Sequence, residues 1–125
     1  MNTIPKKILG RKHELTTEFL DLLDQHIDDI VNGRTNYIFK IKDFAEQLSL
    51  NARHFSNVIK LVTKRSPVDL LEERLVAEAE LMLSQSDLAI AEIANKLTFQ
   101  DPETFEKLFK RVSGKQPLSV GVLKC

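Results

Sequence analysis

A short run of residues carries side chains that can recognise nucleic-acid bases. Arg53 offers paired N–H donors that match guanine, and the amide of Asn57 matches adenine. Ser56 accepts several hydrogen-bonding patterns, and the methyl group of Ala52 suits the methyl of thymine. In a helix these four positions share one side. The run therefore predicts a helix whose outer face reads base edges in the major groove of DNA.

Cations surround this predicted reading face. Lys60, Lys64 and Arg65 follow it, and residues 52–65 contain no acid. Basic side chains in such a place neutralise DNA phosphates, and His54, which borders the face, is a further candidate for a phosphate contact. The alternative interpretation is an ordinary solvated helix surface.

Part of the chain occurs twice. Residues 43–67 and residues 92–117 share their apolar pattern, with one extra residue in the second turn. Matching positions include Ala45 with Ala94, Leu48 with Leu97, Phe55 with Phe105, and Pro67 with Pro117. Each copy predicts a short helix, a tight turn and a second helix that is basic toward its end. Two such units favour a domain that reads adjacent major grooves of DNA with helices at 52–64 and 102–113.

Apolar periodicity predicts an all-α fold of about seven helices. Asn51 and Asp101 are expected N-caps, and Ser66 and Pro67 should begin a long helix. The expected regions are a basic N-terminal arm (1–13), a first helix-turn-helix subdomain (about 14–65), a linker helix (about 66–85) and a second subdomain (about 86–124) that closes with a short helix at 117–123. A linker helix of this size is about 28 Å long. Successive major grooves on one DNA face lie roughly 34 Å apart, so a monomer could span both.

Composition is that of a soluble globular protein, with 29% charged and 42% apolar residues. The net charge of zero counts mildly against nucleic-acid binding, but the charges are segregated. Residues 1–12 are basic without an acid, and residues 14–31 are acidic without Lys or Arg. We expect no membrane span and no signal peptide. The single cysteine, Cys125, cannot form an internal disulfide, which favours a cytoplasmic protein.

Catalytic chemistry has no support in the sequence. His13, His26 and His54 are dispersed and lack the Cys or carboxylate partners of a metal site. We expect His13 and His26 to be packed or solvent-facing. No Gly-rich phosphate loop or nucleophile motif occurs. We therefore expect no catalytic residue, no metal and no cofactor, and not an enzyme.

Two stretches, AEQLSLNARHFSNVIKLVTKRSP and SDLAIAEIANKLTFQDPETFEKLFKRVSGKQP, give the chain a family likeness. From about Phe19 to Val122 it resembles the DNA-binding domain of the AraC/XylS family of bacterial transcription regulators. The resemblance implies seven helices, with two helix-turn-helix subdomains joined by a long helix. It also implies sequence-specific binding to double-stranded DNA that activates or represses transcription, often through contact with RNA polymerase.

The resemblance also implies site residues in the second subdomain. Base contacts map onto Pro102, Glu103, Glu106 and Lys107, and Lys110 and Arg111 are added as phosphate contacts. Glu103 and Glu106 accept from cytosine but are repelled by phosphates, so the first subdomain is expected to read and the second to position, or to have lost contact.

The chain departs from the family pattern at two glycines. Lys64 stands where the family usually has Gly after the first reading helix, which predicts an altered exit from that helix, and Thr98 replaces a second Gly.

Two questions stay open at this level. Residues 1–13 are too few for an effector pocket, so no small-molecule effector domain is expected in this chain. The arm itself is expected to be disordered and solvated, with contact to DNA as the alternative. The alternative function is a helical protein-interaction module that kept the fold and lost DNA binding, which the zero net charge and the two glutamates favour.

Overall fold

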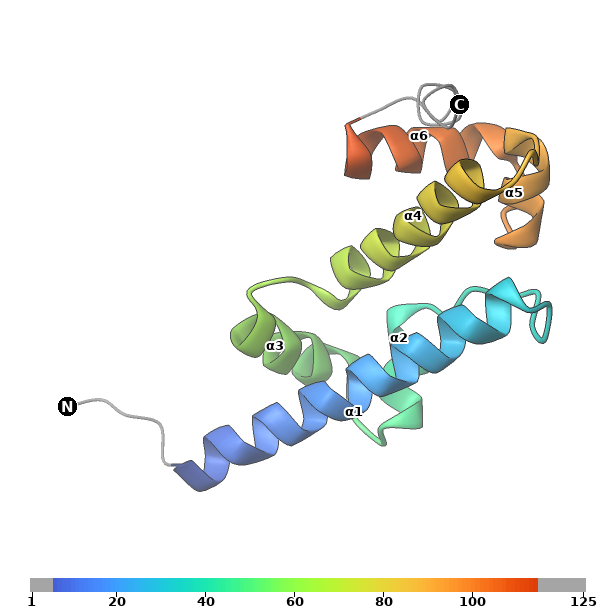
Figure 1. Ribbon diagram of the computed structural model, residues 1–125. Coiled ribbons are helices and arrows are strands. Elements are labelled where there is room, and N and C mark those ends of the chain that lie inside the picture. The colour runs from blue at the N-terminus through green and yellow to red at the C-terminus, as the bar shows by residue number, and fades with distance from the viewer. Residues whose placement is uncertain (1–5, 115–125) are drawn as a thin grey trace. The chain divides into compact units, whose positions relative to one another are not determined.

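The computed structural model describes residues 6–114 of the chain, with side chains from Gly10 onward, and contains six α-helices and no strand over that range (Figure 1). They are α1 (Lys6–Val31), α2 (Ile41–Gln47), α3 (Ala52–Thr63), α4 (Pro67–Gln85), α5 (Ile90–Lys96) and α6 (Pro102–Ser113). The predicted all-helical class is confirmed. The predicted closing helix at 117–123 and Cys125 lie outside the described residues.

The contacts divide the chain into two compact units. Within the described residues, unit 1 comprises 6–26 and 39–70, and unit 2 comprises 27–38 and 71–114. Unit 1 contains most of α1, all of α2 and α3, and the first residues of α4. Unit 2 contains the end of α1, most of α4, and α5 and α6. Each unit therefore holds one complete helix-turn-helix.

The first helix is longer than predicted. It was expected to begin near residue 14, after a disordered arm, but α1 begins at Lys6 and runs for 26 residues. No proline interrupts Lys6–Val31, and a glycine such as Gly10 is tolerated inside a long helix at a cost of about 1 kcal/mol. The basic residues 6–13 are thus the first turns of a helix, and the expectation of a disordered arm is wrong for this stretch.

Aromatic rings form the core of unit 1. Phe19 of α1, Phe44 of α2 and Phe55 of α3 are each fully buried. The ring of Phe19 meets Phe44 edge-on at 5.4 Å and Phe55 at 5.0 Å between centroids, geometries that aromatic pairs prefer. The three helices therefore share one contact point, and this fixes the orientation of α3.

His26 ties the connection after α1 to the core of unit 1. Its side chain is buried, its ring stacks on Phe39 at 4.1 Å, and its Nε2 accepts a hydrogen bond of 2.9 Å from the backbone N–H of Phe39. An imidazole nitrogen that accepts must be unprotonated. The expectation that His26 is packed rather than catalytic agrees with this geometry, and His13 is solvent-exposed, as also expected.

Unit 2 repeats this packing. Ile93, Ala94 and Leu97 of the α5 region and Phe105 and Phe109 of α6 are buried. These positions match residues of α2 and α3 in the first copy, where Ala45, Phe55 and Ile59 are also buried. The shared apolar pattern is therefore a shared core.

The helix starts follow the predicted capping chemistry. The side chain of Asn51 accepts from the N–H groups of Arg53 (2.8 Å) and His54 (3.2 Å), and Asp101 accepts from Glu103 N–H at 3.0 Å. Ser66 accepts from the N–H of Asp69 at 3.1 Å, in front of α4. These side chains satisfy backbone donors that have no partner inside the helix. The predicted caps at Asn51, Asp101 and Ser66 are confirmed.

The predicted alteration at the exit of α3 is wrong. Lys64 adopts the left-handed conformation (φ 65°), and its N–H donates to the Lys60 carbonyl at 2.9 Å. At the end of α6, Gly114 does the same, with φ 74° and a bond of 2.8 Å to Lys110. The two exits are alike because the closing hydrogen bond outweighs the steric cost of a left-handed lysine.

Candidate nucleic-acid interface

The outer face of α3 presents the predicted reading residues together. Arg53 and Asn57 are exposed, and Ala52 and Ser56 are half-buried at its edge. The opposite face of the helix is buried through Phe55 and its neighbours, so the reading side chains are held outward by a fixed core. A helix anchored on one face and polar on the other can enter a major groove.

The predicted phosphate contacts flank this face. His54 and Lys60 are exposed on α3, and Lys64 and Arg65 are exposed just beyond its end. The exit is held by Thr63, whose hydroxyl donates to the Arg65 carbonyl at 2.9 Å and accepts from the Arg65 N–H at 3.0 Å. All four predicted residues therefore lie on one helix and its anchored exit.

The surface of α6 differs in charge. Pro102, Glu103, Glu106 and Lys107 are exposed, as the prediction requires. However, the carboxylate of Glu103 lies 3.5 Å from the ammonium of Lys107, so an acid and a base of the predicted site form an ion pair with each other. The N-cap of this helix, Asp101, adds a third acid. Unlike α3, this face combines both signs of charge.

Arg111 of α6 has a partner inside unit 2. Its guanidinium donates two hydrogen bonds to the two carboxylate oxygens of Glu72 on α4, at 3.2 Å and 2.9 Å. Paired contacts of this kind are among the stronger ion pairs, although the arginine side chain is 62% exposed. The structure thus gives Arg111 a role in joining α6 to α4, and its contact with phosphate stays a prediction. Lys110 is exposed.

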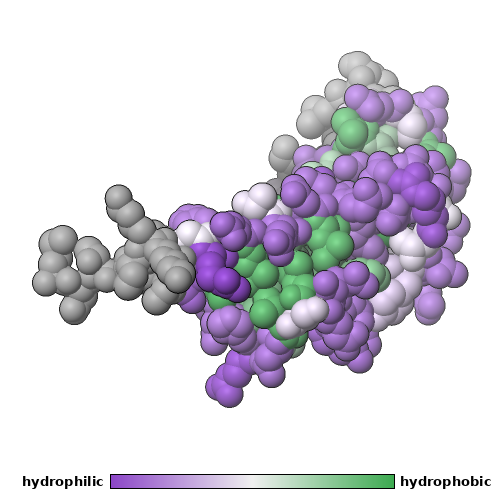
Figure 2. All heavy atoms as spheres, turned by 90° about the horizontal axis from the view of Figure 1, so that it is seen from below, coloured by the Kyte–Doolittle hydropathy of each residue, from purple (hydrophilic) through white to green (hydrophobic). Residues whose placement is uncertain are grey.

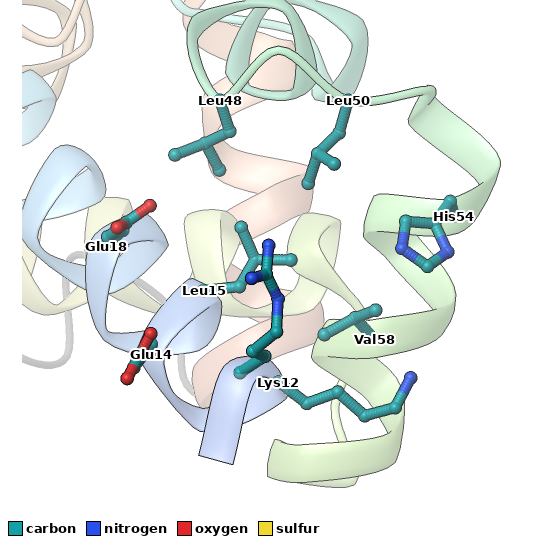
Figure 3. Close-up of a pocket in the computed structure, with 9 residues that line it drawn as sticks. Lys12, Glu14, Leu15, Glu18, Leu48, Leu50, His54 and Val58 are labelled. Carbon is teal, nitrogen blue, oxygen red and sulfur yellow. The ribbon is translucent and has the colours of Figure 1, made fainter. Parts of the chain in front are cut away.

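Two residues outside the predicted list lie beside α3. Arg11 and Lys12 of α1 line a groove of about 380 Å³ that also includes His54 (Figure 3). Its floor is apolar, with Leu15, Leu48, Leu50 and Val58. Figure 2 shows a hydrophobic area on one face of the molecule, framed by hydrophilic side chains. The sequence signal for Arg11 and Lys12 was the basic run at residues 1–12, which contains no acid. Because this run was expected to be disordered, its residues were not expected beside α3.

Other site types find no support in the part of the chain that the structure describes. Over residues 10–114, no group of three His, Cys, Asp or Glu side chains could hold a metal ion. Over the helices from Lys6 to Ser113, none is long and apolar enough to cross a membrane.

A family model for a helix-turn-helix domain matches residues 44–120. The matched range covers more than half of the chain. It begins inside α2, contains α3–α6 and nearly all of both repeated copies, and includes the residues predicted to contact bases and phosphates.

Two curated bacterial proteins are similar to the chain. It is 34% identical over 77 residues to the raffinose operon transcriptional regulatory protein RafR of Pediococcus pentosaceus, which covers 62% of this chain and 28% of that protein. It is 25% identical over 91 residues to the Msm operon regulatory protein of Streptococcus mutans, covering 73% of this chain and 33% of that protein. The chain thus spans about a third or less of the length of these relatives.

A solved structure confirms the fold. The DNA-binding domain of AdpA, a global transcriptional factor crystallised in complex with a target DNA, has a TM-score of 0.72 to this chain at 20% identity. The match covers 86% of this chain and 90% of that domain. The two chains therefore share an architecture although most of their residues differ.

Proposed function

The chain belongs to the AraC-type helix-turn-helix family of DNA-binding transcription regulators, and from this premise we propose that α3 is its sequence-reading helix. In this proposal Arg53, Ser56 and Asn57 contact base edges in the major groove, with Ala52 against a thymine methyl. His54, Lys60, Lys64 and Arg65 hold the phosphates on either side.

One observation carries the proposal: α3 exposes Arg53 and Asn57 on a face without any acid, while Phe55, Val58 and Ile59 on its other side are buried. The phosphates of DNA attract such a face. Side chains that form two hydrogen bonds with one base can distinguish one base pair from another. The neutral N-cap Asn51 leaves the positive end of the helix dipole uncompensated by a carboxylate.

For the second unit we propose a positioning role. Pro102, Glu103, Glu106 and Lys107 face outward, but the Glu103–Lys107 ion pair must be broken before either side chain can bond a base. Lys110 supplies phosphate attraction, and Arg111 contributes mainly by holding α6 to α4. The second unit would then add affinity and register, and less sequence discrimination.

The wider biological role is inferred from the relatives. RafR and the Msm protein are named as operon regulators of bacteria. We propose that this chain regulates transcription in the bacterial cytoplasm by occupying a duplex site, with RNA polymerase as the partner when the site adjoins a promoter.

Substitutions at Arg53 and Lys60 test the assignment of α3. Arg53→Ala should weaken binding to the preferred duplex by about 1–3 kcal/mol and relax the choice at one base pair, since a bidentate base contact is lost. Lys60→Ala should weaken binding to all duplexes nearly equally and lower the salt slope of log affinity by about one. Fluorescence anisotropy against the preferred duplex and its single-base variants measures both.

Lys107→Ala is the matched control on α6, because it removes one exposed cation from the equivalent helix. It should leave sequence preference unchanged. If Arg53→Ala also leaves preference unchanged, α3 is not the reading helix. If the unmodified protein binds no duplex at low salt but binds a protein partner independently of salt, the protein-interaction alternative replaces the proposal.

A further inference from the structure

The charges at the two ends of α1 are opposite in sign to those that stabilise a helix. Its first turn holds Lys6 and Lys7 with no acid, and its last turn holds Asp28 and Asp29 with no base. Helices favour the opposite order, because their N-terminus is partly positive and their C-terminus partly negative. When charged residues oppose the helix dipole and no contact in the protein offsets the cost, a functional requirement is the expected reason for their presence.

The two ends of α1 differ in how this cost is offset. At the C-terminal end, Arg34 donates to the carboxylates of both Asp28 and Asp29, and the pKa of Arg34 is raised mainly by its hydrogen bond with Asp29 and then by that with Asp28. At the other end, no ion pair joins Arg11 or Lys12 to an acid within the described residues. Among the described side chains of α1, Asp28 and Asp29 therefore have a cationic partner, whereas Arg11 and Lys12 have no ion pair.

The N-terminal cations lie next to the first turn of α3. Arg11 and Lys12 line the groove together with His54, which flanks the reading face (Figure 3). Two acids, Glu14 and Glu18, line the same groove, but Figure 3 shows their carboxylates on the side of α1 away from α3, whereas Lys12 extends toward α3. Positive charge therefore gathers where α1 and α3 meet.

We propose that Arg11 and Lys12, together with His54, bind a backbone phosphate of the DNA whose major groove α3 reads. This inference rests on the proposed function of α3. A helix inserted in the major groove lies between two phosphate backbones, and side chains at its flank face one of them. The cations of α1 extend the positive flank of α3 onto a second helix, and a phosphate supplies the negative partner that Arg11 and Lys12 lack among the described residues.

An acidic peptide is the other anionic occupant to consider, and the observations favour DNA. The groove carries Glu14 and Glu18 at one side, which would repel a peptide acid lying along its length. A single phosphodiester needs only the α3 side, where the cations lie. The position next to His54 also makes the site continuous with the predicted reading face.

The test measures salt-dependent binding of three single variants to a random-sequence duplex. Arg11→Ala and Lys12→Ala should each weaken binding several-fold at low salt and lower the salt slope of log affinity by about one. Arg34→Ala is the charge-matched control at the opposite end of α1, and it should keep the slope of the unmodified protein. Far-UV circular dichroism checks that each variant stays helical.

Amide hydrogen exchange provides a readout that a general charge effect would not move. Exchange at residues 10–14 should slow on addition of the duplex, because a phosphate held there stabilises the first turns of α1. If Arg11→Ala and Lys12→Ala keep the full slope and exchange at 10–14 is unchanged while the protein still binds DNA, this inference is overturned and the role of α3 stands. If the unmodified protein binds no duplex, both proposals fail together.

Discussion

The two helix-turn-helix units have nearly the same interior and different exteriors. Phe55 and Phe105 are both essentially buried, and α3 and α6 are both 12 residues long with a left-handed residue at the end. Outside, α3 carries basic and amide side chains without acids, whereas α6 mixes Glu103 and Glu106 with its cations. The interior determines that a unit folds, and the exterior determines what it can bind.

Buried and exposed positions in the two units carry different information: the first about the fold, the second about binding. Buried positions tolerate few changes of volume, so they preserve the architecture even at the 20% identity seen with the AdpA domain. Exposed positions can change charge at little cost in stability, so one copy can keep a DNA-reading surface while the other loses it. The shared fold of the two units therefore does not imply that they share a function.

The largest expected effect tests the shared interior. Phe55→Ala and Phe105→Ala should each lower the free energy of unfolding by about 3–5 kcal/mol, since each removes a fully buried ring. Urea unfolding followed by circular dichroism measures both. A cost below about 1 kcal/mol for one ring alone would show that its unit relies on other packing, and the claim of equal interiors would fail.

The next effect tests the different exteriors. The double change Glu103→Gln with Glu106→Gln should tighten binding to all duplexes by about 1 kcal/mol, because it removes two negative charges from the face of α6 that is proposed to lie near phosphates. Anisotropy titration at low salt measures it, with the double change Glu78→Gln and Glu80→Gln on α4 as the charge-matched control. Unchanged affinity in the double variant would place α6 away from DNA.

The smallest effect compares the two helix exits. Lys64→Gly should stabilise the protein by about 0.5–1 kcal/mol, and Gly114→Ala should destabilise it by about 1 kcal/mol. At Gly114 an added Cβ meets nothing within 4 Å, so its cost is purely that of the left-handed backbone. Thermal unfolding gives both values. Effects of the same sign would mean that the exits are not equivalent.

Local signals in the sequence predicted most of the fold. Periodic apolar residues predicted the all-helical class, and Asn51 and Asp101 identified the starts of α3 and α6 because capping is decided by near neighbours. The early start of α1 was missed, since charge composition suggested a solvated tail while no residue actually stopped the helix. The left-handed Lys64 was missed because residue type alone disfavours it.

The candidate site was less accessible to sequence reasoning. Exposure of Arg53 and Asn57 follows from helix periodicity. The Arg111–Glu72 pair could not be foreseen, since it joins residues far apart in the chain, and neither could the meeting of Arg11 and Lys12 with His54. Contacts of this kind depend on how helices pack, and a one-dimensional pattern does not encode them.

The most direct test of the central claim is selection of random duplex DNA by the purified protein at moderate salt, with sequencing of the bound pool. The account predicts an enriched motif dominated by one half-site, and loss of one position of that motif when the selection is repeated with Arg53→Ala. A second half-site of equal strength, about one helical turn away, would show that α6 reads as well as α3. No enrichment at any salt would contradict the claim that the chain reads DNA sequence.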